Sequence, residues 1–194
     1  MKVLVVGAGI AGLSAAYDLI KAGADVTVLE SERRSGGVIV SERPDGRWVV
    51  EGGPDSFLAS DQEIPRLAGE LGIPDRLVRQ LAHGSALWTG TALQPLDEGQ
   101  AAALLGIQAR PEDLAAGHAS FAGGMAQLVE ALMDVVGPAV RYRVGVTSAR
   151  RATTGGFLLS GTGGQTMQGD ALVIALPAPA AARLFSGLDR KSVV

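Results

Sequence analysis

Three glycines near the N-terminus have a spacing that can bind a diphosphate. Gly7 permits a sharp turn, Gly9 lets backbone N–H groups approach a pyrophosphate at the positive end of a following helix, and Gly12 permits close packing of that helix. Glu30, 18 residues after Gly12, is placed to accept hydrogen bonds from ribose hydroxyls. The pattern predicts a dinucleotide-binding turn. The segment that matches G-x-G-x-x-G consists of Gly7, Ala8, Gly9, Ile10, Ala11 and Gly12.

A second cluster of residues indicates which dinucleotide this turn would bind. Residues 30–37 read E-x-x-x-R-x-G-G, with a guanidinium at Arg34 and bare backbone at Gly36 and Gly37. Because a guanidinium makes charge-assisted hydrogen bonds with phosphate, this cluster adds a second contact to the same pyrophosphate and favours FAD over NAD. We also expect Ser31 to contact the cofactor. A site for the 2′-phosphate of NADP is the remaining alternative.

The elements around these residues form a strand–helix–strand unit. Lys2–Val6 is a continuous β-branched run, typical of a parallel strand buried on both faces. Residues 10–22 have apolar positions at helical spacing, and Gly23 follows where a left-handed residue commonly ends a helix. Residues 25–30 form the second strand. We therefore predict an α/β fold with a Rossmann-like parallel sheet and a right-handed crossover.

The rest of the chain is predicted to contain two hairpins, two helices and an antiparallel β-meander joined by glycines. The hairpins are expected at residues 38–51 and 86–96, and the helices after a capping box at residues 60–63 and along the apolar stripe of residues 125–136. The strands of the meander are expected at residues 140–151, 157–160 and 166–176, the last ending in a buried arm. Residues 97–120 are expected to be weakly structured.

Composition excludes several classes of chemistry. The chain has 194 residues, a formal net charge of -3, no cysteine and two histidines, His83 and His118. Without cysteine there is no disulfide or thiolate metal site, and the two histidines, expected in exposed loops, are too few for a catalytic zinc. The acidic balance without a run of Lys or Arg argues against nucleic acid as a partner. The most apolar stretch, residues 3–17, is shorter than the about 18 residues of a membrane span.

Three later segments carry a pattern that identifies a family. They are residues 49–58 (Val-Val-Glu-Gly-Gly-Pro-Asp-Ser-Phe-Leu), residues 121–125 (Phe-Ala-Gly-Gly-Met) and residues 169–184. The first is similar to a strand that runs into G-P-D-S-F/W beside the flavin of porphyrinogen oxidases, the second to their GGM helix, and the third to the strand and helix that close their flavin domain. The sequence therefore resembles the flavin-containing amine oxidase superfamily, and within it the protoporphyrinogen and coproporphyrinogen oxidases.

The resemblance implies a cofactor and further site residues. FAD would be held by the glycine clusters, with Gly53, Pro54, Asp55 and Ser56 beside the flavin and the backbone of Val146 at the adenine. Asp55 has the alternative of shaping its own turn. Hydride would pass from a porphyrinogen to N5 of the flavin, with oxygen or another acceptor restoring FAD. Since this chemistry belongs to the cofactor, no catalytic side chain and no metal are expected.

The resemblance also marks two family segments that this chain lacks. Family members carry a helical substrate and membrane-surface domain before the GGM helix, and a flavin-contacting segment near their C-terminus. We therefore expect an incomplete two-domain flavoprotein with a substrate-domain gap. Its expected parts are residues 1–97 and 121–188 for FAD binding, residues 98–120 as a loop at the gap, and residues 189–194 as an artefactual tail, because they back-translate to the start of a common sequencing adapter.

The expected function is that of an FAD-dependent oxidoreductase of the porphyrinogen oxidase type, with weakened or absent turnover in this chain. Two alternatives stay open. One is another oxidoreductase, similar to amine oxidases or carotenoid desaturases, and the other is an inactive dinucleotide-binding fragment. The expected partner is a porphyrinogen-type small molecule, and the expected location is the cytoplasm, with membrane contact only in longer family members.

Overall fold

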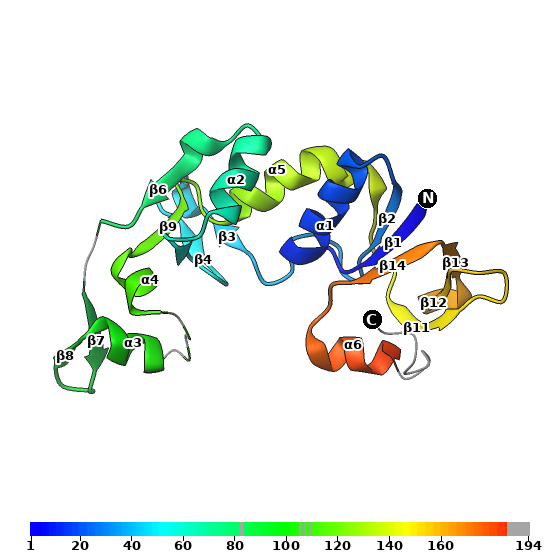
Figure 1. Ribbon diagram of the computed structural model, residues 1–194. Coiled ribbons are helices and arrows are strands. Elements are labelled where there is room, and N and C mark those ends of the chain that lie inside the picture. The colour runs from blue at the N-terminus through cyan, green and yellow to red at the C-terminus, as the bar shows by residue number, and fades with distance from the viewer. Residues whose placement is uncertain (82–83, 105, 107, 109, 186–194) are drawn as a thin grey trace. The chain divides into compact units, whose positions relative to one another are not determined.

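The computed structural model describes residues 1–81, 84–104, 106, 108 and 110–185, which fall into two compact units (Figure 1). The first unit consists of Met1–Val40 and Leu128–Val194, and the second of Ser41–Gln127. This division differs from the boundaries expected near residues 97 and 120, because the strands that follow residue 40 pair with partners inside the second unit. The expected tail, residues 189–194, lies outside the described residues.

The first unit is built on a four-stranded parallel sheet. The order of its strands is β10 (Val140–Arg141), β2 (Asp25–Leu29), β1 (Lys2–Val6) and β14 (Ala171–Ile174). β1 pairs in parallel with β2 and β14, and β2 pairs in parallel with β10. Helix α1 (Ile10–Lys21) connects β1 to β2 and packs against both. The predicted Rossmann-like α/β unit is confirmed.

Local sequence explains the ends of these elements. The apolar residues 3–6 are all buried, as the continuous β-branched run of β1 indicated. Gly23 adopts φ +80, and the N–H groups of Gly23 and Ala24 donate to the carbonyls of Ile20 and Leu19. A left-handed residue therefore ends α1, as glycine allows without steric cost.

A three-stranded antiparallel sheet completes the first unit with two helices. The sheet contains β11 (Val146–Arg151), β12 (Phe157–Gly161) and β13 (Thr166–Gly169), and the helices are α5 (Ala126–Val136) and α6 (Ala178–Phe185). The first two residues of α5, Ala126 and Gln127, belong to the second unit. One hydrophobic core contains residues of both sheets, so it joins them. Burial of each large aliphatic side chain in this core contributes about 1.5–3 kcal/mol. Its buried members are Leu4, Val6, Leu29, Val144, Ala149, Leu159 and Leu184.

Two predicted strands are each divided in the structure. Residues 140–151 form β10 in the parallel sheet and β11 in the antiparallel sheet, because Arg143 adopts φ +60 and turns the chain between them. Residues 166–176 form β13 and β14, which meet at Asp170, whose Oδ2 accepts the backbone N–H of Lys2 at 2.7 Å. The arm expected to be buried is half-buried, since among the described residues β14 is an edge strand.

The second unit contains two hairpins, a small sheet and three short helices. The predicted hairpins are confirmed as β3 (Ser41–Glu42) with β4 (Val50–Glu51), and β7 (Ser85–Trp88) with β8 (Leu93–Leu96). The antiparallel sheet has the order β5 (Phe57–Leu58), β9 (His118–Phe121), β6 (Leu77–Arg79). The helices are α2 (Glu63–Glu70), α3 (Glu98–Leu104) and α4 (Pro111–Ala115). Short 3-10 turns occur in this unit at Pro44–Gly46 and Pro74–Arg76, and in the first unit at Gly137–Ala139 and Thr162–Gly164.

The expectation of weak structure over residues 97–120 is wrong, because α3, α4 and β9 all lie there. Asp97 and Gln100 form a reciprocal capping box: the N–H of Gln100 donates to Asp97 Oδ1 at 2.7 Å, and the N–H of Asp97 donates to Gln100 Oε1 at 3.1 Å. Pro111 begins α4 at a position that suits proline. His118 is half-buried in β9 rather than exposed in a loop, and His83 lies outside the described residues.

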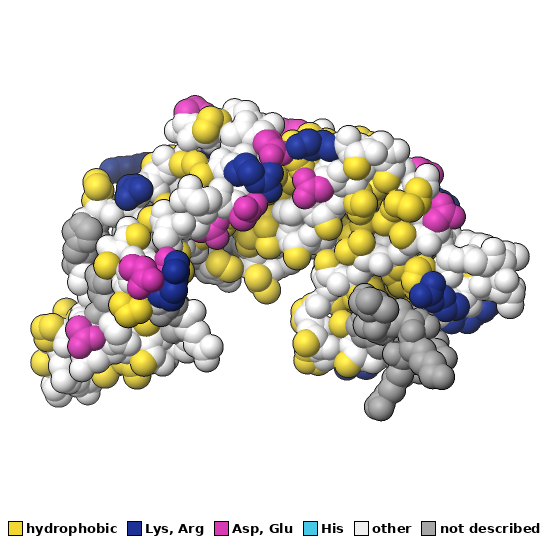
Figure 2. Space-filling view, viewed as in Figure 1, with side chains coloured by type: hydrophobic (Ala, Val, Ile, Leu, Met, Phe, Trp, Pro, Cys, Tyr) yellow, Lys and Arg dark blue, Asp and Glu magenta, His cyan; other side chains and the backbone are white. Residues whose placement is uncertain are grey.

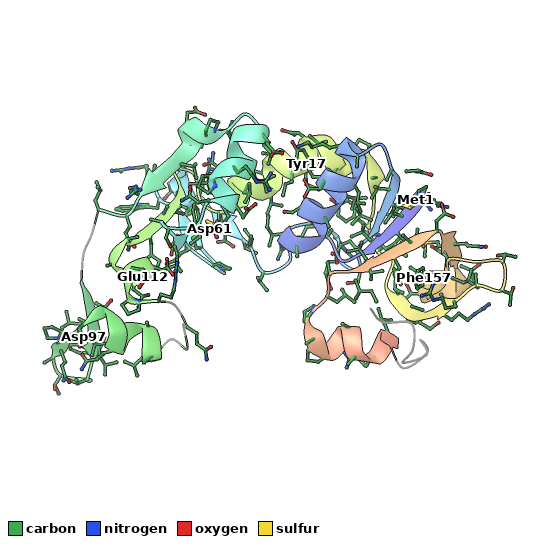
Figure 3. All side chains as sticks on the ribbon, viewed as in Figure 1. Met1, Tyr17, Asp61, Asp97, Glu112 and Phe157 are labelled. Atoms are coloured by element: carbon green, nitrogen blue, oxygen red, sulfur yellow. The ribbon has the colours of Figure 1, made fainter. Side chains whose placement is uncertain are left out.

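Helix α2 is capped by a different residue from the one predicted. Oδ1 of Asp61, which is labelled in Figure 3, accepts the N–H groups of Glu63 at 2.7 Å and Ile64 at 3.1 Å. The side chain of Ser60, the predicted cap, instead hydrogen-bonds to Asp113. A carboxylate near the first turn also interacts favourably with the helix dipole, so Asp61 is a suitable cap.

Three observations on the described residues bear on function. Figure 2 shows hydrophobic side chains over β7 and β8, where Leu87, Trp88 and Leu93 are exposed. Among the described residues, the helices are too short or too polar to cross a membrane. The same residues include no group of three or more His, Cys, Asp or Glu side chains that could hold a metal ion.

Candidate functional site

The first loop leaves β1 through a turn that requires glycine at two positions. Gly7 adopts φ +102, and a Cβ there would lie 2.4 Å from the carbonyl oxygen of Ala175. A Cβ on Gly12 would lie 1.9 Å from the carbonyl oxygen of Gly7. Both distances are far below any normal carbon–oxygen contact. The geometry therefore agrees with a tight turn at Gly7 and close helix packing at Gly12.

Gly9 differs from these two glycines, because the protein leaves room for a side chain at its position. No protein atom lies within 4 Å of the position that its Cβ would occupy. Gly9 is the N-cap of α1 and provides no side-chain cap for the first-turn N–H groups of that helix. Open space beside such N–H groups, at the positive end of the helix dipole, suits a pyrophosphate.

The second glycine cluster lies directly against the first. The N–H of Gly36 donates to the carbonyl of Ala8 at 2.8 Å, and Gly9 and Gly36 form an isolated parallel bridge. A Cβ on Gly37 would lie 3.3 Å from Cα of Gly9, and Gly36 and Gly37 both have positive φ. The structure therefore brings together the two clusters that the sequence singled out.

Glu30 joins the same site from the end of β2. Its side chain is buried, and Oε2 accepts the N–H of Ala8 at 2.7 Å. Oε1 accepts the N–H of Glu32 at 2.9 Å and the hydroxyl of Ser31 at 3.2 Å. The carboxylate therefore holds the backbone of both loops, a role that the sequence pattern did not indicate.

The guanidinium of Arg34 donates hydrogen bonds to the backbone of its own loop. Its Nη1 donates to the carbonyls of Ser35 at 3.1 Å and Ile39 at 3.3 Å, and Nη2 donates to the carbonyl of Gly37 at 2.6 Å. The predicted contact with phosphate stays a prediction. What the structure adds is that the planar guanidinium fixes the backbone around Gly36 and Gly37.

The segment before Val146 runs beside Glu30 and Ser31. The N–H of Glu30 donates to the carbonyl of Arg141 at 2.9 Å, and the N–H of Val144 donates to the carbonyl of Glu30 at 2.8 Å. A Cβ on Gly145 would lie 3.9 Å from Cβ of Ser31. Val146, half-buried at the start of β11, therefore directly follows a segment that is hydrogen-bonded to Glu30.

Tyr142 is a site residue that sequence reasoning missed. Its hydroxyl lies 2.9 Å from Oγ of Ser35, so it ties the loop around Gly36 to the chain that follows β10. The two residues are 107 positions apart and belong to no common motif, so the sequence contained no signal for this contact.

The predicted flavin contacts belong to the second unit and form a separate group. Gly53, Pro54 and Asp55 are exposed, and Ser56 is half-buried. The carbonyl of Asp55 accepts the hydroxyl of Ser120 at 2.7 Å, and its Oδ1 accepts the hydroxyl of Ser56 at 2.8 Å. These bonds shape the local backbone, and cofactor contact by this group stays a prediction.

The second unit also contains a small pocket of about 280 Å³. Its lining is apolar apart from one guanidinium, and none of the predicted cofactor residues lines it. The lining residues are Phe57, Ala59, Pro65, Leu77, Val78, Arg79 and Ala119.

A parallel sheet with two converging glycine loops and a buried carboxylate defines a Rossmann-like α/β fold. The chain belongs to a particular family with this architecture. A family model described as flavin containing amine oxidoreductase matches residues 10–91 and 80–191.

Curated relatives of this chain are oxidoreductases. The coproporphyrinogen III oxidase of Propionibacterium freudenreichii subsp. freudenreichii is 45% identical over 75 residues, which are 39% of this chain and 14% of the relative. The coproporphyrinogen III oxidase of Bacillus subtilis (strain 168) is 31% identical over 147 residues, 73% of this chain and 30% of the relative. A chloroplastic/chromoplastic 15-cis-phytoene desaturase of Narcissus pseudonarcissus is 45% identical over 78 residues, 40% of this chain and 14% of the relative. The chain thus spans less than a third of the length of each of these relatives.

The fold is also similar to solved structures. A crystal structure from Exiguobacterium sp. 255-15, described as a protoporphyrinogen oxidase, superposes with a TM-score of 0.77 at 21% identity. The match covers 95% of this chain and 61% of the solved chain. At this identity the similarity establishes a shared fold.

Proposed function

We propose that this chain binds FAD and forms the cofactor-holding part of an oxidoreductase that acts on a porphyrinogen. One observation carries the FAD assignment: Gly9 is bridged to Gly36, and the space beside Gly9 is open. A side chain at Gly9 would extend into this open space, which we assign to the diphosphate. Membership of a flavin-dependent family favours FAD over NAD or NADP.

Each part of the site has a role in this proposal. The N-terminus of α1 receives the pyrophosphate, and the Glu30 carboxylate, fixed by Ala8 and Glu32, accepts a ribose hydroxyl. Arg34 keeps Gly36 and Gly37 in place, and the backbone at Val146 meets the adenine. The remaining predicted contacts come from the first glycine loop, the start of α1 and the residue after Glu30. They are Ala8, Ile10, Ala11, Gly12 and Ser31. When bound, FAD supplies the capacity to accept a hydride from substrate.

A porphyrinogen is the proposed substrate because curated relatives that match this chain are named coproporphyrinogen III oxidase. Gly53–Ser56, which match the porphyrinogen oxidase pattern, are the proposed flavin contacts. An oxidoreductase of the desaturase or amine oxidase type is the second candidate, favoured by the similarity to a phytoene desaturase over 78 residues.

A substrate panel under anaerobic conditions tests this proposal. The purified chain, loaded with FAD, is mixed with coproporphyrinogen III, protoporphyrinogen IX, an aryl amine or phytoene, and the visible flavin absorption is followed. Bleaching by a porphyrinogen alone supports the proposal. Bleaching by the amine or by phytoene would favour the second candidate, and a chain that binds FAD but is bleached by none is a cofactor-binding fragment without turnover.

A further inference from the structure

The residues directly before helix α5 have no side chain that could cap its first N–H groups. The three residues before Ala126 are Gly-Gly-Met, which carry neither a hydroxyl nor a carboxylate. Its first N–H groups are bound instead by the hairpin β3–β4. The N–H of Met125 donates to Oε1 of Glu51 at 2.8 Å, and the N–H of Ala126 donates to Oγ of Ser41 at 2.9 Å. Residues 74 or more positions away in the chain therefore cap this helix.

Glu51 and Ser41 act as one capping group. They face each other in the register of the hairpin, and the Ser41 hydroxyl donates to Oε2 of Glu51 at 2.6 Å. Gly124 has φ +94, and a Cβ there would lie 2.5 Å from Oγ of Ser41 and 2.8 Å from Oε1 of Glu51. The close approach thus requires glycine, and the half-buried carboxylate interacts favourably with the helix dipole.

Glu51 also fixes one end of the segment of residues 52–56. At the other end, Phe57 pairs with Ala119 in the antiparallel sheet, and the Ser120 hydroxyl holds the carbonyl of Asp55. Residues 52–55 between these anchors are exposed. A short backbone segment that is held at both ends and open between them is preorganised to meet a ligand.

We propose that Glu51 is a positioning residue for the flavin end of the cofactor. By accepting the N–H of Met125, directly before α5, and the hydroxyl of Ser41, it fixes β4 and with it the backbone of residues 52–56. Glu51 itself does not touch the cofactor. This inference rests on the proposed function, in which Gly53–Ser56 contact the flavin ring.

A comparison of FAD with ADP isolates this role, since ADP contains the part of FAD assigned to Gly7–Gly12 and Glu30 but has no flavin ring. Calorimetry on the full chain gives the Kd of each ligand. We expect Glu51→Ala and Ser41→Ala to raise the Kd of FAD about tenfold and to leave the Kd of ADP within about twofold of wild type. The visible spectrum of the bound flavin should shift toward that of free FAD.

Two further variants sharpen the test. Glu51→Gln keeps an oxygen that can accept the N–H of Met125, so its Kd for FAD should stay within about threefold of wild type. Glu42→Ala is the matched control, because Glu42 lies on the same hairpin with an exposed side chain and should leave both ligands unaffected.

The outcomes separate this inference from the proposed function. A wild-type chain that does not bind FAD overturns the proposed function and this inference with it. Wild-type binding of FAD with Glu51→Ala weakening FAD and ADP equally, or neither, overturns the positioning role alone. If Glu51→Ala fails to fold, Ser41→Ala decides: faster hydrogen exchange at the Ala126 amide with an unchanged Kd for FAD contradicts the inference, and a raised Kd supports it.

Discussion

Oε2 of Glu30 accepts a hydrogen bond of 2.7 Å from the backbone N–H of Ala8. The acidic residue at the end of β2, for which we propose a contact with ribose, therefore also holds the first glycine loop. The N–H of Gly36 donates to the carbonyl of Ala8. Both polar groups of the Ala8 backbone are thus bonded within the protein, and the N–H groups at the start of α1 are the ones placed to meet a diphosphate.

Removing the Glu30 carboxylate should lower both stability and cofactor affinity. Glu30→Ala leaves the buried N–H of Ala8 without an acceptor, which costs about 1–3 kcal/mol of the free energy of unfolding. Urea unfolding and FAD calorimetry measure the two effects. Glu32→Ala, which removes an exposed carboxylate two residues away, is the control. A Glu30→Ala chain as stable as this control would contradict the assigned role.

Gly12→Ala should destabilise the first unit without any ligand present. Its Cβ would have to displace the carbonyl of Gly7, and overpacking of this kind costs about 1–3 kcal/mol or more. Thermal unfolding should give a lower Tm than wild type. Gly69→Ala in α2, where a Cβ meets no protein atom within 4 Å, should not lower it. Equal Tm values for Gly12→Ala and Gly69→Ala would contradict this prediction.

Arg34→Ala should loosen the second loop and weaken FAD binding about tenfold, which is about 1.4 kcal/mol. Three carbonyls lose their donor, so the amides of Gly36 and Ile39 should exchange hydrogen faster. Arg34→Lys should bind FAD nearly as weakly as Arg34→Ala, because a compact ammonium cannot donate hydrogen bonds to these carbonyls in the geometry of a planar guanidinium. Arg33→Ala, an exposed neighbour, is the control; the prediction fails if both alanine variants behave alike.

The Arg110–Asp113 pair at the start of α4 should respond to acid. The Arg110 guanidinium, with a smaller contribution from Ser60, holds the pKa of the Asp113 carboxyl below its ordinary value. Because the folded pKa is the lower one, the stabilisation by this pair is present above the ordinary carboxyl pKa and is lost as pH falls through the folded value. An NMR titration of the Asp113 carboxyl carbon should show its pKa rising in Arg110→Ala. An unchanged pKa would contradict the assigned cause.

The parts of the site that could be predicted are those encoded by neighbouring residues. The strand run of β1, the helical spacing of α1 and the two glycine clusters follow from local periodicity and turn chemistry, and the structure reproduces the elements and joins the clusters. The Asp97–Gln100 capping box could also be predicted, because its two residues are three positions apart. The Ala- and Gly-rich composition around it favoured the prediction of weak structure instead.

The missed features depend on residues far apart or on unusual backbone. Glu51 binds Met125 across 74 positions, and Ser35 meets Tyr142 across 107, so no window of one sequence contains either contact. The division of β10 from β11 depends on Arg143 in the left-handed region, which arginine seldom adopts. A single sequence therefore predicts which elements and glycine loops form better than it predicts the contacts that hold the loops in place.

The most direct test of the account is the affinity of Gly9→Val for FAD. Gly9 has extended backbone angles of φ -71 and ψ 176, and nothing lies within 4 Å of its Cβ position, so valine fits the protein and fills only the space assigned to the diphosphate. We predict that calorimetry detects FAD binding to the wild-type chain and none to Gly9→Val, with equal Tm for the two proteins without ligand. Gly9→Val that binds FAD as tightly as wild type would contradict the proposed cofactor site.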